Sequence, residues 1–86
     1  MISKGLLIKN PSGLHARPAT QLSDLCQGFK SELIIEFDDI VIEPRSVLSI
    51  LCAGIHPGST VTLIADGDDE QIAVDEITKL IISFKE

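Results

Sequence analysis

The chain has 86 residues and 44% hydrophobic content, but it contains no Trp, no Tyr and three Phe, so aliphatic side chains and alanine must fill its core. A chain of this length has room for one hydrophobic core, and we expect a single domain over residues 1–86. Thirteen acidic against seven basic residues give a formal charge of −6, which disfavours nucleic acid and anionic lipid and favours a protein as partner.

The first half of the chain predicts a strand, a helix and a hairpin. Residues 2–9 place apolar side chains on one parity and predict a strand that ends at an Asn-Pro-Ser-Gly turn cluster. Over residues 16–28, apolar side chains recur at spacings of three and four, which predicts an amphipathic helix closed by a glycine. Residues 31–37 alternate apolar and polar side chains, and two aspartates turn the chain into residues 40–42, so we expect a β-hairpin.

The second half predicts a short helix, a strand and a long helix. Pro44 interrupts the strand pattern, Ser46 offers an N-cap oxygen, and residues 47–53 then form a short apolar helix. Alternation over residues 60–65 predicts a further strand before an Asp-Gly turn. The last helix, over residues 69–84, carries one apolar stripe that we expect to face the core: Ala73, Val74, Ile77, Leu80, Ile81 and Phe84.

These elements follow one another in the order β-α-β-β-α-β-α. The hairpin requires an antiparallel neighbour, so an all-parallel sheet is excluded, and the helices are best packed on one side of the sheet. We therefore predict an α+β two-layer sandwich.

The junction between the first strand and the first helix carries the segment Gly-Leu-His-Ala-Arg-Pro-Ala at residues 13–19. Gly13 allows a backbone geometry closed to other residues, and Pro18 suits the first helical turn, where its missing N–H has no helical partner. His15 then lies at a helix N-terminus, where backbone amides attract anions and favour a neutral, nucleophilic imidazole. Arg17 adds a permanent charge suited to phosphate. A lone histidine would indicate a solvated cap, whereas this combination indicates phosphate chemistry.

The other reactive side chains lack such support. His56 lies in a His-Pro-Gly turn and predicts a surface histidine. Cys26 and Cys52 fall on predicted apolar helix faces, so we expect reduced thiols in or near the core and no Cys–His nucleophile pair. The histidines and cysteines do not have zinc-ligand spacing, and we predict no metal and no cofactor.

At these residues the chain resembles the HPr family, the histidine phosphocarriers of the bacterial phosphoenolpyruvate-dependent phosphotransferase system. The resemblance rests on the segment at residues 13–19, on Arg-Ser-Val-Leu at residues 45–48 and on Ala-Gly before the Pro57-Gly58 turn, and it covers the full chain. It implies an open-faced β-sandwich, in which a four-stranded antiparallel sheet of order 1-4-2-3 carries three helices on one face.

The resemblance also implies a reaction and its site. His15 accepts a phosphoryl group on Nδ1 from phosphorylated enzyme I and passes it to an EIIA-type acceptor protein. Arg17 assists the transfer, and Ser12, Ala16 and Pro18 support the phosphate. Such a carrier is not an autonomous enzyme, because it only positions the phosphoryl group between two nucleophiles.

The short helix at residues 47–53 has more apolar residues than one face can bury, so part of it must face solvent. In the family this outward patch docks enzyme I and the acceptors, and the docking residues we expect here are Val47, Leu48, Leu51, Thr20 and Gln21. Ser46 has two interpretations that the sequence leaves open. It is a structural N-cap, or it is in addition a serine that a dedicated HPr kinase phosphorylates, as in Gram-positive members.

Two functions of different classes follow: a phosphocarrier, or a regulatory binding module of the same fold that phosphorylation at Ser46 controls through a regulator protein. The sugar-transport branch and the nitrogen branch (NPr) both stay open, because two helical segments also resemble the nitrogen paralogue. No apolar run approaches the roughly 18 to 20 residues that a bilayer requires, and no signal peptide begins the chain. We therefore expect a monomeric cytoplasmic protein without membrane insertion.

Overall fold

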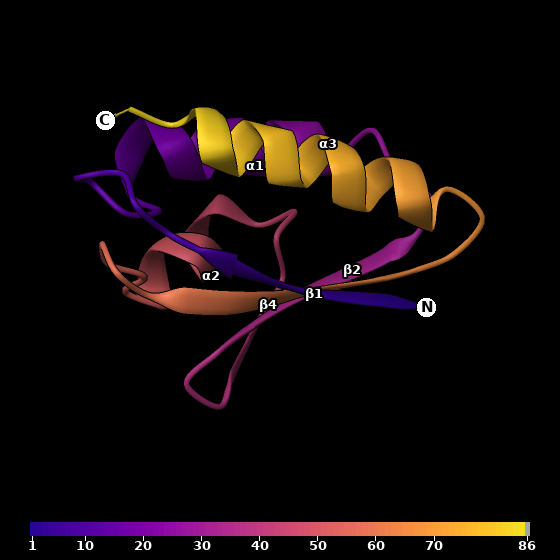
Figure 1. The fold of residues 1–86 in the computed structure, drawn as a ribbon, viewed down its shortest axis with the longest axis horizontal. Helices are drawn as coiled ribbons and strands as arrows, with labels where there is room; N and C mark the ends of the chain where they lie inside the picture. The colour runs from indigo at the N-terminus through magenta and orange to yellow at the C-terminus, as the bar shows by residue number, and fades with distance from the viewer. Residues whose placement is uncertain (86) are drawn as a thin grey trace.

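The computed structural model describes residues 1–85, which form four strands and three helices. The elements in chain order are β1 (Ile2–Leu7), α1 (Ala16–Cys26), β2 (Glu32–Phe37), β3 (Ile40–Ile42), α2 (Val47–Cys52), β4 (Thr60–Asp66) and α3 (Glu70–Ser83). The predicted order β-α-β-β-α-β-α is confirmed, and Figure 1 shows the helices and strands along the chain.

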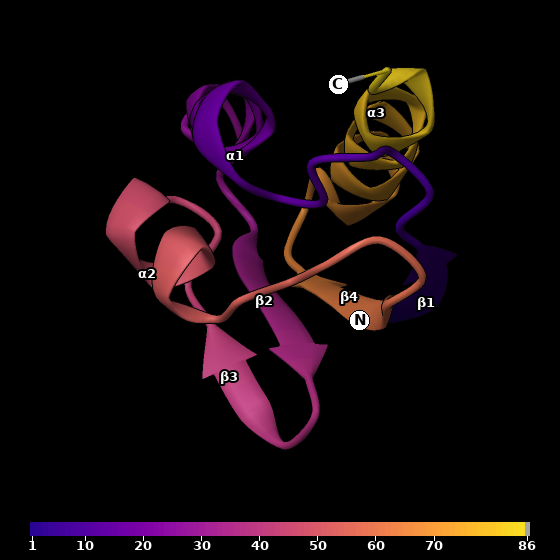
Figure 2. The ribbon, with the colours of Figure 1, turned by 90° about the vertical axis from the view of Figure 1, so that its left-hand side faces the viewer.

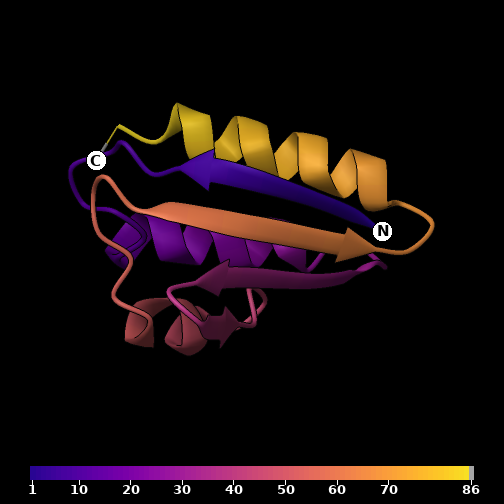
Figure 3. The ribbon, with the colours of Figure 1, turned by 60° about the horizontal axis from the view of Figure 1, so that its bottom comes forward.

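The strands form one antiparallel sheet in the order β1-β4-β2-β3, as the family resemblance implied. In the centre of the sheet, Ile35 of β2 lies opposite Leu63 of β4 on one side and Ile42 of β3 on the other. The helices α1 and α3 lie over one face of this sheet (Figure 1), and α2 lies beside α1 near the β2–β3 end (Figure 2). The opposite face carries no helix (Figure 3), so the described residues 1–85 have the open-faced sandwich fold.

The core lies between the sheet and the helices, and strand alternation decides which side chains enter it. The buried strand residues, including the one directly after β1, are Leu6, Ile8, Leu33, Ile35, Phe37, Ile42, Val61, Leu63 and Ala65. The helices contribute Ala19, Leu22, Cys26, Ile50, Ala73, Val74, Ile77 and Ile81. Each large aliphatic side chain in this set stabilises the fold by about 1.5 to 3 kcal/mol relative to an exposed position. The expected aliphatic core is confirmed.

Four elements end earlier than the sequence predicts. The first strand ends at Leu7 rather than at residue 9, although the Ile8 N–H still donates to the Ser59 carbonyl at 2.8 Å. The helices α1, α2 and α3 end at Cys26, Cys52 and Ser83, one or two residues short of the expected positions. Such ends depend on the last backbone hydrogen bond, which hydropathy does not report.

The predicted apolar stripe of α3 is buried in the middle of the helix. The helix also carries apolar side chains that the core does not bury. Leu80 and Phe84 are half-buried rather than buried, and Thr78 is buried although it is polar. Ile72 and Ile82 remain 60% and 75% exposed. Position around the helix axis, rather than hydropathy, therefore decides which α3 side chains reach the sheet.

The two cysteines are free thiols with opposite surroundings. Cys26 is buried, and burial raises its pKa to about 12, so this thiol is chemically inert. Cys52 is exposed, and its placement in or near the core was wrong. It follows Ile50 by two residues, or about 200° around the helix axis, and Ile50 is the α2 residue that is buried.

Asp69 links α3 to the turn that precedes β2. It occupies the N-cap position of α3, but its carboxylate accepts hydrogen bonds from the Lys30 N–H at 2.8 Å and the Ser31 N–H at 2.9 Å. It also accepts a short hydrogen bond from the Ser31 hydroxyl. These bonds, that of the Ser31 hydroxyl foremost, hold the pKa of Asp69 below its ordinary value of 3.8.

The lowered pKa of Asp69 predicts acid destabilisation. Its ionised form stabilises the fold above pH 3.8, the ordinary value, and we expect this contribution to be lost as pH falls through the lower folded value. Urea midpoints between about pH 2.5 and pH 7 should therefore show a flatter pH dependence in Asp69→Asn than in the native chain. The neighbouring exposed Asp68 provides a matched control. An unchanged slope in Asp69→Asn, or the same flattening in Asp68→Asn, would contradict the assignment.

Candidate functional site

The loop between β1 and α1 is closed on itself by a buried asparagine. Asn10 is 4% exposed, and its Nδ2 donates to the Gly13 carbonyl at 2.7 Å. The Gly13 N–H donates to the Asn10 carbonyl at 3.0 Å. Leu14 is fully buried, and its N–H donates to the Ile55 carbonyl at 3.1 Å. The loop is thereby also tied to the segment that follows α2.

Gly13 is required at this position for two reasons. Its φ of +58° lies in the left-handed region, which favours glycine. A Cβ at this position would also collide with the Ile55 carbonyl oxygen and lie 3.0 Å from the His56 Cα. The sequence-based expectation of an unusual backbone geometry at Gly13 is confirmed, and the close contact with residues 55–56 is an additional constraint.

His15 occupies the N-cap position of α1, as the sequence predicted. Its backbone is extended, with φ −113° and ψ 164°, and its side chain is exposed. Within the described part of the chain, the imidazole makes no capping hydrogen bond to the helix, and the first turn of α1 contains no acidic residue. A helix of 11 residues therefore presents its positive end beside an exposed imidazole.

The residue after His15 adopts a backbone conformation that its amino-acid type does not predict. Ala16 has φ +49°, in the left-handed region, which costs an alanine about 1 to 2 kcal/mol. The Thr20 hydroxyl donates to the Ala16 carbonyl at 3.3 Å. Alanine is a strong helix former, so its presence gave no signal of this strain.

The remaining residues expected around the phosphate lie close to His15 along the chain. Ser12 and Arg17 are exposed, on either side of His15, whereas Pro18 is buried in the first turn of α1. Pro18 has no N–H and cannot donate to an anion, so its contribution is to shape the helix start. The support of a phosphate by Ser12, Ala16 and Pro18 stays a prediction.

The helix α2 has a buried and an exposed apolar side. Ile50 is fully buried, Val47 is half-buried, and Leu48 and Leu51 are 70% and 37% exposed. The expectation that part of this helix faces solvent is confirmed. The other two expected docking residues, Thr20 and Gln21, are exposed on α1, which packs against α2 (Figure 2).

Ser46 is the N-cap of α2, and its Oγ accepts from the Ser49 N–H at 3.1 Å. The structural interpretation of Ser46 is therefore confirmed. It is half-buried and stands directly before the exposed apolar residues of α2. Its phosphorylation stays a prediction.

His56 is an exposed histidine in the turn before β4, as predicted. Its Nδ1 lies 3.0 Å from the Pro57 carbonyl oxygen, and its ring packs edge-on against Phe37, with 6.0 Å between ring centroids. The His56 backbone borders Gly13, but the ring is engaged at the end of β2. His56 therefore contacts the loop before His15 through its backbone, which packs against Gly13.

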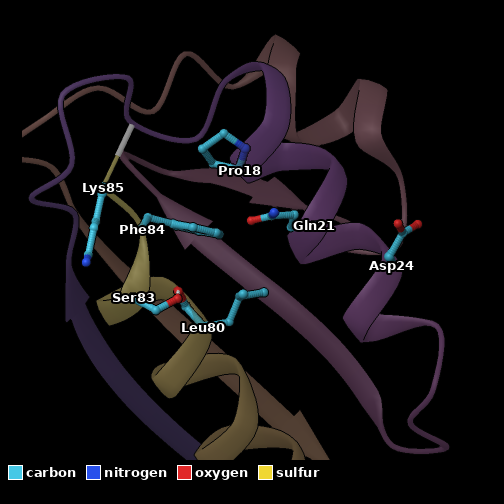
Figure 4. Close-up of a pocket in the computed structure, with 7 residues that line it drawn as sticks. All are labelled: Pro18, Gln21, Asp24, Leu80, Ser83, Phe84 and Lys85. Carbon is cyan, nitrogen blue, oxygen red and sulfur yellow. Dashed lines mark hydrogen bonds between the residues drawn. The ribbon is translucent and has the colours of Figure 1, made fainter.

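A groove lies between α1 and the C-terminal end of α3, with a volume of about 580 Å³. Figure 4 shows the residues that line it, which are Pro18, Gln21 and Asp24 from α1 and Leu80, Ser83, Phe84 and Lys85 from the C-terminal end of α3 and the residues after it. Neither His15 nor Arg17 lines this groove. Among residues 1–85, His, Cys, Asp and Glu side chains form no cluster of three that could hold a metal ion. No helix in the same range is long and apolar enough to cross a membrane.

Comparisons with known proteins agree with this geometry. A family model described as the PTS HPr component phosphorylation site matches residues 2–83. The chain belongs to the HPr family. Over the full length of both sequences, this HPr-family chain is 35% identical to the phosphocarrier protein HPr of Borreliella burgdorferi. It is 36% identical over 81 residues to the HPr-like protein Crh of Halalkalibacterium halodurans, covering 94% of this chain and 96% of the relative.

Solved structures of similar proteins share the fold of this HPr-family chain. HPr-C-His from Thermoanaerobacter tengcongensis is similar with a TM-score of 0.93 and 36% identity, covering 96% of this chain and 93% of that one. A structure described as an HPr dimer from the same organism has a TM-score of 0.77 and 37% identity, covering 91% of this chain and 90% of that one. The resemblance inferred from the segment at residues 13–19 is therefore confirmed at the level of the family and the fold.

Sequence reasoning missed two residues that shape this site. Asn10 was expected only as part of a turn cluster, whereas it is the buried brace of the loop. Arg45 was noted only as part of a motif, whereas its side chain and backbone join several segments. A buried asparagine beside Gly13 could have been suspected from the turn chemistry, but no local signal identifies the partners of Arg45.

Proposed function

We propose that this HPr-family protein is a single phosphocarrier domain over residues 1–86 that carries a phosphoryl group on His15. The observation that carries the proposal is the exposed imidazole at the N-terminus of α1, in a first turn without acidic residues. Enzyme I donates the phosphoryl group: the bond from phosphorus to enzyme I breaks as a bond to Nδ1 of His15 forms. An EIIA-type acceptor then takes the group: the bond from phosphorus to Nδ1 breaks as a bond to a nucleophile of the acceptor forms. The chain positions the group and is not an autonomous enzyme.

The charge of the transferred group is met by the start of α1. The backbone N–H groups of the first turn have no helical acceptors, and they favour an anion. Arg17 supplies a permanent charge two residues from His15, while Ser12 lies exposed in the preceding loop. The left-handed backbone of Ala16 sets the direction in which the chain leaves His15. We assign Ser12, Ala16 and Pro18 to the support of the phosphate.

A phosphorylation assay tests the proposed function. The chain is incubated with phosphoenolpyruvate and enzyme I from a sugar system or from a nitrogen system, in parallel, and its intact mass is followed over time. We expect one phosphoryl group, fast labelling by the cognate enzyme I, and transfer onward to an EIIA-type protein. The adduct should be labile in acid and stable in base, as phosphohistidine is. Absence of labelling by both enzymes would overturn the proposal.

Replacement of Arg17 by alanine should slow the transfer and keep the fold. Loss of one positioned donor that meets transition-state charge typically costs about 2 to 4 kcal/mol, or roughly 30-fold to 1,000-fold in rate. Arg17 is exposed, so circular dichroism and the Tm should change little. Stopped-flow or quench-flow transfer from enzyme I measures the effect. A rate equal to that of the native chain would remove Arg17 from the mechanism.

We propose that enzyme I and the acceptors dock on one surface beside His15, formed by Val47, Leu48 and Leu51 of α2 with Thr20 and Gln21 of α1. Exposed apolar side chains on a small protein mark sites of association. Desolvation of Leu48, which is 70% exposed, contributes about 1 to 2 kcal/mol, and that of Leu51, which is 37% exposed, contributes about 0.5 to 1 kcal/mol. Such values suit a transient complex once the cost of association is subtracted. We place this carrier in the cytoplasm as a monomer, where both partners reach the same surface.

Leu48→Asp and Ser46→Asp should both impair docking and leave the fold native. Leu48 is exposed, and aspartate is a good N-cap residue at position 46, so circular dichroism should be unchanged. A new charge at the apolar surface should slow phosphotransfer from enzyme I about ten-fold or more, which corresponds to a loss of about 1.4 kcal/mol. Native rates in Leu48→Asp would overturn the docking surface. Native rates in Ser46→Asp alone would leave Ser46 as a structural cap.

A second candidate function is a regulatory binding module controlled by phosphorylation of Ser46. The similarity to the HPr-like protein Crh and the place of Ser46 at the start of the exposed apolar helix favour it. A helix N-terminus tolerates a phosphate, but two negative charges at the edge of the docking surface would change its partners. Incubation with an HPr kinase and ATP tests it, and mass mapping of the label to Ser46 is the expected result.

A further inference from the structure

The position of α2 is not set by its own burial. The helix has six residues and Ile50 is the one that is fully buried, so few core contacts orient it. It packs mainly against α1 rather than on the sheet. The exposed apolar residues Leu48 and Leu51 therefore depend on the segments at the two ends of α2 for their position relative to His15.

The C-terminal end of α2 is tied to the His15 loop. The Leu14 N–H donates to the Ile55 carbonyl at 3.1 Å, and Gly13 packs against the same stretch of backbone. This contact locates residues 54–56 next to the start of α1. It leaves the other end of α2, at Ser46, to be located separately.

Arg45 locates that other end with both its side chain and its backbone. Its Nη2 donates to the Phe29 carbonyl at 2.7 Å and to the Ser31 carbonyl at 2.9 Å, in the turn that follows α1. Its own carbonyl accepts from the Ser23 hydroxyl of α1 at 2.7 Å and from Gln27 Nε2 at 2.8 Å. The next residue along the chain is the N-cap of α2. Arg45 thus joins α1, the turn before β2 and the start of α2.

We propose that Arg45 is a positioning residue for phosphotransfer, which holds α2 against α1 so that Leu48, Leu51 and His15 face one partner together. The inference rests on the proposed function. The Arg45 guanidinium is half-buried and engages main-chain carbonyls, so it acts through the placement of α2. Its contribution is to hold the docking surface in its binding geometry before the partner arrives, which lowers the entropy cost of association.

Steady-state kinetics test the inference, with enzyme I as catalyst, phosphoenolpyruvate as phosphoryl donor and this chain as the varied substrate. Arg45→Ala should raise the KM of enzyme I for this chain about five-fold, which corresponds to the net loss of roughly one hydrogen bond. The kcat should not change, because the surroundings of His15 are intact. Arg45→Lys should restore part of the affinity, since an ammonium reaches one of the carbonyls. A fall in kcat with an unchanged KM would overturn the inference.

Two further variants separate positioning from direct contact and from general loosening. Ser23→Ala removes a donor to the Arg45 carbonyl, keeps the Arg45 charge and lies out of reach of a partner, because Ser23 is buried. Ser23→Ala should therefore raise the KM, as Arg45→Ala does. Val74→Ala creates a small cavity in α3, away from Arg45, and should lower the Tm without a change in KM. An equal rise of KM in Val74→Ala, or none in Ser23→Ala, would contradict a positioning role.

Amide hydrogen exchange on the free protein provides a readout that does not depend on enzyme I. Exchange of the α2 amides should accelerate in Arg45→Ala and in Ser23→Ala, with the β1 and β4 amides unchanged. If the native chain takes no label from any enzyme I, the proposed function fails whatever these variants show. If the native chain is labelled and Arg45→Ala keeps the native KM and native α2 exchange, the inference about Arg45 fails alone.

Discussion

Replacement of His15 by alanine is expected to abolish phosphorylation by enzyme I and to leave the fold unchanged. The His15 imidazole is exposed and makes no capping hydrogen bond within the described residues, so its loss should change the free energy of unfolding by no more than about 0.5 kcal/mol. Removal of the nucleophile leaves the donor without an acceptor atom, and no residual transfer is expected. Intact-mass spectrometry and urea unfolding measure the two effects on the same sample.

The second histidine is the matched control for this experiment. His56 is also exposed, but its ring packs against Phe37 and its Nδ1 lies next to the Pro57 carbonyl. His56→Ala should therefore take up label at the native rate. Label that persists in His15→Ala, or that maps to the peptide containing His56, would show that the phosphorylated residue was assigned incorrectly.

Gly13→Ala is expected to be strongly destabilising and to displace the phosphorylation site. The left-handed φ of Gly13 costs an alanine about 1 to 2 kcal/mol, and the collision of its Cβ with the Ile55 carbonyl adds about 1 to 3 kcal/mol. For a domain of this size the Tm should fall by roughly 10 °C or more. Relief of the collision would move the loop away from residues 55–56, so transfer to His15 should slow in the molecules that remain folded.

Gly54→Ala separates the backbone conformation from the collision. Gly54 has a similar φ of +67°, but a Cβ there would meet no atom within 4 Å. Its replacement should cost only the conformational part, about 1 to 2 kcal/mol, reduced by the lower entropy of alanine in the unfolded chain. Thermal unfolding of both variants provides the comparison. Equal losses of stability in Gly13→Ala and Gly54→Ala would contradict the role given to the Ile55 contact.

The sequence by itself determined those features of this protein that depend on neighbouring residues. The alternation in β2 and β4, the periodicity of α1 and the Ser46 cap are set by local backbone geometry, so their patterns were sufficient to predict them. His15 could be placed at a helix N-terminus because glycine, histidine and proline each have a positional meaning at a strand-to-helix junction.

Only the tertiary structure decided the features that join distant segments. The buried brace at Asn10, the contact of Gly13 with Ile55 and the ties of Arg45 to α1 depend on which loops meet after the sheet has formed. The same is true of Cys52, which a short helix turns outward because its one buried face belongs to Ile50. Hydropathy reports which residues along the chain are apolar. Burial depends on how each helix packs against its neighbours, and that packing exists only in the folded state.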